Sequence, residues 1–167
     1  MKAKTQNYER APVKDGERLW IGDPSYILGS SDWSCACDFL SAAGCDDDDQ
    51  PREHVYRVEL DGGFFFVAKT QHGDGNYIGK TSQRYSVEAG MLAIIPENMI
   101  TRGDCVKFGK IFEMKRGYIE LWREEDGSFI FRNNGEVIES IDTEDIGCTG
   151  DIIDDILGQN NELWDIS

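Results

Sequence analysis

Residues 117–141, GYIELWREEDGSFIFRNNGEVIESI, decide the fold. Three runs rich in β-branched and aromatic residues, at 117–123, 128–132 and 136–141, are separated by two short polar segments. The separating segments, Glu124-Glu125-Asp126-Gly127 and Asn133-Asn134-Gly135, are typical of tight turns that need positive φ. The stretch therefore predicts a three-stranded antiparallel meander.

A second hairpin is indicated upstream of the meander. Residues 54–60 and 64–68 read as strands, and Asp61-Gly62-Gly63 separates them. The second strand holds three consecutive phenylalanines, which cannot all point to one face of a sheet. Either this sheet is covered on both faces or one ring marks a contact surface, and we expect cover by the first helix. Further strands are expected at 18–22, 84–87 and 91–95, and Val106, Phe108, Ile111 and Phe112 are expected in strands.

Two short helices complete the expected fold. Ser30-Ser31-Asp32 reads as a cap for a helix over residues 33–43, with Trp33, Cys37 and Leu40 on one face. Residues 149–158 fit an amphipathic helix near the C-terminus. We predict a single α+β domain over residues 1–167, mostly an antiparallel β-sheet (a curved sheet, sandwich or partial barrel) with two short helices. Residues 1–15 are expected to form a flexible leader, 45–52 an acidic loop, and 142–167 an acidic C-terminal segment.

The net charge of −15 is concentrated in two stretches. Six acidic residues and no Lys or Arg lie between Asp32 and Asp49, and ten lie between Asn133 and Ser167, so the remaining chain is nearly neutral. A field of one sign attracts cationic partners, whereas direct nucleic-acid binding requires clustered basic residues that this chain lacks. We predict that the partner-binding residues are acidic, with one exposed aromatic anchor: Asp46, Asp47, Asp48, Asp49, Asp151, Asp154, Asp155 and Trp164.

Membrane, metal and cofactor sites are not expected. No run approaches the roughly 18 apolar residues of a membrane helix, and the N-terminus lacks a secretory signal, so a cytoplasmic location is expected. The spacing of Cys35, Cys37, Cys45 and His54 matches no common zinc pattern, and free thiols are expected. The run of aspartates at 46–49 lacks the ligand spacing of an EF-hand. We therefore predict neither a metal nor a cofactor.

Two loops could carry a site. The first holds Asp23 and Tyr26, and the second holds His72, Asp74 and Tyr77. An Asp in such a turn can bond to backbone N–H groups just downstream, which is a structural role, or it can hold a ligand. As an enzyme, the chain would use His72 as proton carrier, with a tyrosine as auxiliary acid. Because no nucleophile elbow, phosphate loop or zinc helix is present, we lean against catalysis.

The same loops carry a resemblance. Leu19-Trp20-Ile21-Gly22-Asp23-Pro24-Ser25-Tyr26, the Gly-Asp-Gly-x-Tyr core within Thr70–Tyr77, and the segment from Val87 to Pro96 resemble a family of small bacteriophage proteins without an assigned activity. The match covers roughly residues 19–96. Members often have Cys where Ser25 stands, which speaks against a thiolate nucleophile here. The resemblance implies a phage or mobile-element origin and a location in the host cytoplasm.

Three functions remain open from the sequence. The leading hypothesis is a non-catalytic acidic interaction protein that binds and modulates a basic host protein, as an inhibitor or nucleic-acid mimic would. The second is a small-molecule or nucleotide site, binding or hydrolytic, built from the two loops. The third is a virion-associated structural protein. The oligomeric state stays open as well.

Overall fold

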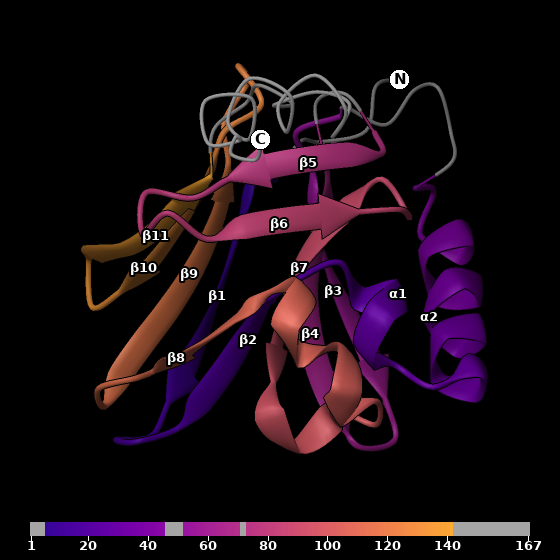
Figure 1. Cartoon of the computed structure of the whole chain (residues 1–167), viewed down its shortest axis with the longest axis horizontal. Helices are drawn as coiled ribbons and strands as arrows, with labels where there is room; N and C mark the ends of the chain where they lie inside the picture. The colour runs from indigo at the N-terminus through magenta and orange to yellow at the C-terminus, as the bar shows by residue number, and fades with distance from the viewer. Residues whose placement is uncertain (1–5, 46–51, 71–72, 142–167) are drawn as a thin grey trace, which may run out of the picture.

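The computed structural model of the chain describes residues 6–45, 52–70 and 73–141, which form three layers (Figure 1). A four-stranded sheet has the order β1-β9-β10-β11, and a five-stranded sheet has the order β3-β4-β7-β2-β8. The helices cover the face of the five-stranded sheet that points away from the four-stranded sheet. All strand pairs are antiparallel. The predicted α+β class, mostly β, is confirmed, and the sheets do not close into a barrel.

The elements of the four-stranded sheet are β1 (Tyr8–Val13), β9 (Gly117–Arg123), β10 (Phe129–Asn133) and β11 (Glu136–Ile141). The five-stranded sheet contains β2 (Arg18–Gly22), β3 (Val55–Leu60), β4 (Gly63–Lys69), β7 (Met91–Pro96) and β8 (Lys110–Glu113). A separate hairpin is formed by β5 (Gly75–Ile78) and β6 (Arg84–Val87). The helical elements are α1 (Pro24–Ile27), α2 (Ser30–Ala42), η1 (Glu97–Met99) and η2 (Gly103–Phe108).

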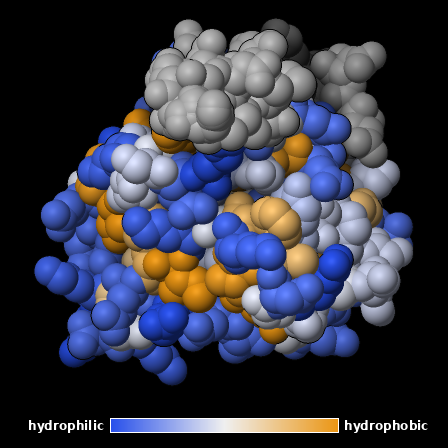
Figure 2. All heavy atoms as spheres, viewed as in Figure 1, coloured by the Kyte–Doolittle hydropathy of each residue, from blue (hydrophilic) through white to orange (hydrophobic). Residues whose placement is uncertain are grey.

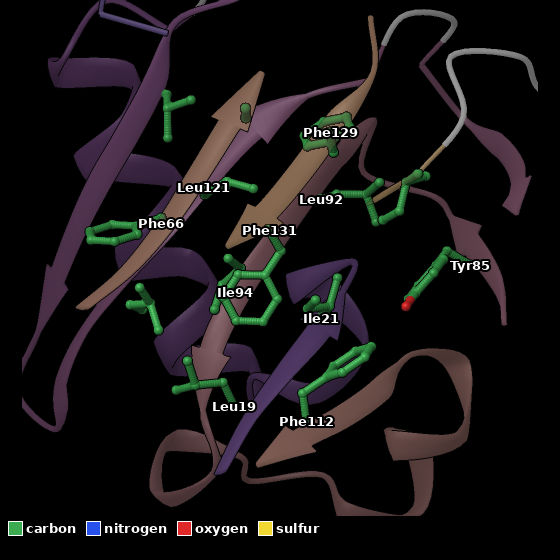
Figure 3. Packing of buried hydrophobic residues seen from close by; sticks show 14 of the residues in the cluster. Leu19, Ile21, Phe66, Tyr85, Leu92, Ile94, Phe112, Leu121, Phe129 and Phe131 are labelled. Carbon is green, nitrogen blue, oxygen red and sulfur yellow. The ribbon is translucent and has the colours of Figure 1, made fainter. Parts of the chain in front are cut away.

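The five-stranded sheet is buried on both faces. Phe66 and Ile94 point into the space between the two sheets, where they meet Leu121 and Phe131 of the other sheet (Figure 3). Phe65, the neighbour of Phe66, points the other way and packs under the helices. The prediction drawn from the three consecutive phenylalanines is thus confirmed, because alternation along β4 requires cover on both sides.

Trp20 explains two glycines, Gly22 and Gly109. Its ring is completely buried, and its Nε1–H donates to the Val106 carbonyl oxygen at 2.8 Å. A Cβ at Gly22 would lie 2.3 Å from this ring, and one at Gly109 would lie 2.1 Å from the Ile21 carbonyl oxygen. Only glycine leaves room for the indole at both positions, and this packing fixes the chain direction just before Asp23.

The expected flexible leader over residues 1–15 is wrong for residues 8–13, which form β1 and pair with β9. Ala11 and Val13 are the only buried residues of β1, and Pro12 is tolerated because β1 lies at the edge of its sheet. The backbone just before β1 also links the two sheets, since the Gln6 carbonyl accepts from the Val55 N–H at 2.8 Å and the Asn7 carbonyl accepts from the Arg123 N–H at 2.8 Å.

Two further local expectations need correction. The predicted buried face of α2 contained Cys37, but Cys37 is exposed. Ala36 and Leu40 are the buried residues of this helix, so Ala36 takes the place that was expected for Cys37. Val106 and Phe108 lie in the 3-10 helix η2 rather than in a strand. The predicted meander and hairpin are present, with the predicted positive φ at Gly127, Asn134 and Gly135. The predicted helix at 149–158 falls outside the described residues.

Candidate functional site

Asp23 is completely buried and holds two loops together. Its Oδ1 accepts from the N–H and the hydroxyl of Ser25, both at 2.8 Å, and so caps the helical turn α1. Its Oδ2 accepts from the backbone N–H groups of Glu88 at 2.6 Å and Ala89 at 2.8 Å, 65 and 66 residues away along the chain. With four hydrogen bonds to its own chain, this carboxylate has a structural role in the loop.

The turn at 88–90 in turn contacts the second loop. The Gly90 carbonyl oxygen accepts from the N–H of the buried Thr70 at 3.0 Å, and the Thr70 hydroxyl donates to the Gly73 carbonyl at 2.6 Å. The hydroxyl of Tyr77, which is also buried, donates to the same Gly73 carbonyl at 3.0 Å. Gly90 lies so close that a Cβ there would be 3.6 Å from Gly73 Cα. The two predicted loops therefore meet, with the 88–90 turn between them.

Three side chains of this junction face the surface, and we call them the two-loop patch: Tyr26, Asp74 and Glu88. The Tyr26 hydroxyl donates to Glu88 Oε1 at 2.9 Å, and its ring stacks on Phe108 at 4.6 Å. Burial, the bond to Glu88 and the negative charges of Glu88, Asp23 and Asp74 raise the pKa of Tyr26 above its ordinary value. The phenol stays protonated near neutral pH, so Tyr26 can donate a hydrogen bond but is a poor base.

The predicted ligand residues therefore divide into two groups. Asp23 and Tyr77 are buried and bonded to backbone, whereas Tyr26 and Asp74 are accessible. His72 lies outside the described residues.

No group of three or more His, Cys, Asp or Glu side chains able to hold a metal occurs within residues 6–45, 52–70 and 73–141. In the same part of the chain, no helix is long and apolar enough to cross a membrane.

A second candidate lies on the helical layer, and we call it the acidic groove. It has a volume of about 300 Å³ between α2 and the β3–β4 turn. Asp32, Glu59 and Asp61 provide carboxylates, while Phe39 and Leu60 provide apolar surface. No Lys or Arg lines it. Arg57 pairs with Glu59 at 3.3 Å, and no ion pair to Asp32 or Asp61 is seen among the described side chains.

The aromatic member of this groove, Phe39, is accessible at the surface. Phe39 is 37% exposed and is one of four large hydrophobic side chains at the surface of the described chain. On the face shown in Figure 2, hydrophobic residues gather across the middle and are bordered by hydrophilic ones. The groove thus places Phe39 beside Asp32 and Asp61, the two carboxylates of its lining without an ion-pair partner among the described side chains. The predicted partner residues Asp46 to Asp49, Asp151, Asp154, Asp155 and Trp164 lie outside the described residues.

Two arginines that were not among the predicted site residues, Arg52 and Arg123, position the second loop. Arg123 is buried, and its Nε–H donates to the Lys69 carbonyl at 2.9 Å. Arg52 donates from Nε and Nη2 to the Thr70 carbonyl at 3.0 and 2.7 Å. Burial, reinforced by the charge of Arg52, lowers the pKa of Arg123 from its ordinary value. The guanidinium groups thus hold the backbone at the start of the loop that carries Asp74. The alternation of Ile119, Leu121 and Arg123 along β9 was the available signal for this inward arginine.

A buried glutamate was also missed. Glu139 is 1% exposed, and its Oε2 accepts from the hydroxyls of Tyr85 at 2.6 Å and Thr81 at 2.7 Å. Burial and the bond to Glu139 raise the pKa of Tyr85 well above its ordinary value, so this phenol remains a donor. The cluster ties the β5–β6 hairpin to β11, where the Lys80 N–H also donates to the Ser140 carbonyl at 2.8 Å.

Comparisons of the chain with protein-family models, curated proteins and solved structures found no match.

Proposed function

We propose that this chain is a non-catalytic acidic interaction protein that binds a basic host protein through the acidic groove. The observation that carries the proposal is the groove itself, in which Asp32 and Asp61, without an ion-pair partner among the described side chains, lie beside accessible apolar surface. Protein interfaces commonly combine an apolar or aromatic anchor with charges that set orientation and encounter rate. The acidic groove has both parts.

The electrostatics of the helical layer favour a cationic partner. Residues 30–45, which contain α2, include Asp32 and Asp38 but no Lys or Arg. The chain continues into the four aspartates at 46–49. Since the negative charge of this layer is not balanced by bases on its own helix, it raises the local concentration of cationic partners and accelerates their association.

The chemistry of the groove indicates what the partner presents. An apolar side chain would pack against Phe39 and Leu60, and flanking Lys or Arg side chains would reach Asp32 and Asp61. Arginine suits the carboxylates because its planar guanidinium can bond to both oxygens of one carboxylate. We therefore propose a basic segment with one bulky apolar residue, and the phage-like motifs make a host regulatory or nucleic-acid-binding protein the proposed source.

The hydrogen bonding at the junction of the two loops favours this proposal over a catalytic site. Asp23 is fully engaged in holding backbone N–H groups, so it is not available as a base or a ligand donor. The two-loop patch itself consists of the carboxylates of Asp74 and Glu88 and the protonated phenol of Tyr26. A fair test of a small-molecule site uses Tyr26→Phe and Asp74→Asn, which leave the buried bonds of Asp23 in place.

Charge reversal in the groove tests the proposed function. The double variant Asp32→Lys/Asp61→Lys is expected to weaken binding of the captured host protein by about tenfold or more, because two attractions become repulsions. The partner is first captured from host lysate at low salt on the wild-type chain and identified. Its affinity for each purified variant is then measured by calorimetry at several salt concentrations.

The matched control is Glu125→Lys/Glu136→Lys, which makes the same change in net charge at two exposed positions, one in the β9–β10 turn and one at the start of β11. This control is expected to change the affinity by no more than about threefold, since distant exposed charges are screened by salt. Equal losses in the two double variants, or an affinity that does not fall as salt rises, would contradict a role for the groove.

A further inference from the structure

A cleft of about 160 Å³ lies between the two sheets, on the other side of the β3–β4 turn from the acidic groove, and it shares no lining residue with the groove or the two-loop patch. Side chains from both sheets line it, including Val13, Leu19, Phe64, Phe66, Ile94 and Ile119. Figure 3 shows Leu19, Phe66 and Ile94 pointing into the space between the sheets. The cleft therefore opens at the surface, beside exposed Pro12, Gly62 and Asn98, and reaches the buried side chains between the sheets.

Small residues account for the opening. Ala11 is the inward residue of β1 at this level, and the exposed Gly62 of the β3–β4 turn and Gly63, the first residue of β4, also line the cleft. None of the three extends a large side chain into the gap between the sheets. Protein interiors rarely leave voids larger than a water molecule, and a dry apolar cavity of about 150 Å³ in another protein holds benzene. The cleft is thus large enough for one small ring.

Two polar side chains line the cleft, Glu17 and Asn98. One carboxylate oxygen of the half-buried Glu17 accepts from the Lys14 backbone N–H at 3.1 Å. The Asn98 side chain donates to the Gly62 carbonyl at 3.4 Å. No Lys or Arg lines the cleft. Arg57 stacks on the Phe64 ring at 3.8 Å from its centroid, but it is paired with Glu59.

We propose that this cleft binds a small monocyclic ammonium ion, with the ring between the sheets and the ammonium group beside Glu17. The size of the cleft limits the apolar part to roughly six to eight non-hydrogen atoms. The carboxylate selects a cation over a neutral or anionic ring of the same shape, and the strongly negative chain adds to this preference. This site is independent of the proposed protein partner.

Three probes of similar shape and different charge test the proposal: benzylamine, benzyl alcohol and benzoate. Each is titrated into protein with labelled isoleucine methyl groups, and the resonances of Ile94 and Ile119 are followed by NMR. Both methyl groups are expected to shift with benzylamine at millimolar concentrations. Benzyl alcohol is expected to bind about tenfold more weakly and benzoate more weakly still.

Variants separate the ring site from the charge. Glu17→Gln keeps an acceptor for the Lys14 N–H, and it is expected to reduce benzylamine affinity to that of benzyl alcohol while leaving benzyl alcohol unchanged. Glu113→Gln removes a nearby carboxylate that does not line the cleft and is expected to change neither. Ala11→Leu, which fills the cleft, is expected to abolish binding of both.

Two results would overturn the proposal. Absence of any shift at Ile94 and Ile119 with all three probes would show that the cleft does not admit a ring. Equal affinity for benzylamine and benzoate, or no effect of Glu17→Gln, would show that the carboxylate does not select the ligand. Because Glu17→Gln is isosteric and half-buried, this arm stays informative even if Ala11→Leu fails to fold.

Discussion

Asp23→Ala is expected to lower the free energy of unfolding by about 4 kcal/mol. The variant loses the cap of α1 and leaves the N–H groups of Glu88 and Ala89 without their acceptor at a completely buried position. Hydrogen bonds to a charged group contribute about 1.5–3 kcal/mol each, and a lost cap costs about 1 kcal/mol. Urea denaturation followed by circular dichroism measures the change as a lower midpoint at constant slope.

Two further variants distinguish a tether from a ligand-binding acid. Asp23→Asn retains one acceptor oxygen and is expected to lose about half as much stability as Asp23→Ala. Asp74→Ala removes an exposed carboxylate of the neighbouring loop and is expected to change stability by less than about 1 kcal/mol. An Asp23→Ala protein within about 1 kcal/mol of wild type would show that the four hydrogen bonds do not hold the loops together.

Glu139→Ala is expected to destabilise the protein by about 3 kcal/mol. Its removal leaves the hydroxyls of the buried Tyr85 and the half-buried Thr81 without their acceptor and opens a cavity at the junction of β6 and β11. Gly79 packs so closely on the carboxylate that a Cβ there would lie 2.4 Å from Glu139 Oε2. The hairpin formed by β5 and β6 is therefore expected to loosen first, which amide hydrogen exchange can measure.

A double-mutant cycle tests whether the glutamate acts through Tyr85. The double variant Glu139→Ala/Tyr85→Phe is expected to be more stable than the sum of the single losses predicts, by about 1–2 kcal/mol, since it leaves no phenol without an acceptor. The control is Glu136→Ala, an exposed glutamate on the same strand, with an expected change under about 0.5 kcal/mol. Additive losses would contradict the proposed coupling.

The local parts of the fold were predictable because their signals are short-range. The turns of the meander need positive φ, and the sequence places Gly127, Asn134 and Gly135 where the chain adopts it. The hairpin of β3 and β4 follows from the same turn chemistry. In both cases the strands that pair are neighbours in sequence, so their pairing requires no information from distant residues.

Long-range pairing explains what the sequence did not predict. β1 pairs with β9 across more than 100 residues, and with Pro12 and only two inward apolar residues it has a weak strand pattern. The alternation of residues in β11 places Glu139 on the same face as Ile141, so its inward direction could have been read. Its partners Tyr85 and Thr81 could not, because they come from a separate hairpin.

The candidate site shows the same division. An acidic residue in a turn that bonds to N–H groups just downstream was one of the two roles considered for Asp23, and its bonds to Ser25 follow that rule. Its bonds to Glu88 and Ala89 depend on β7 pairing with both β2 and β4, which brings the 88–90 turn to the first loop. The acidic groove likewise requires α2 to pack beside β3, which composition alone does not specify.

Mapping the footprint of the captured basic partner tests the proposed function most directly. Amide chemical shifts of the labelled chain are compared before and after the partner is added at low salt. We expect the largest changes at α2 and the β3–β4 turn, around Asp32, Phe39 and Asp61, and we expect them to disappear as salt rises. A footprint centred on Tyr26, Asp74 and Glu88, or on the four-stranded sheet, would contradict binding through the acidic groove.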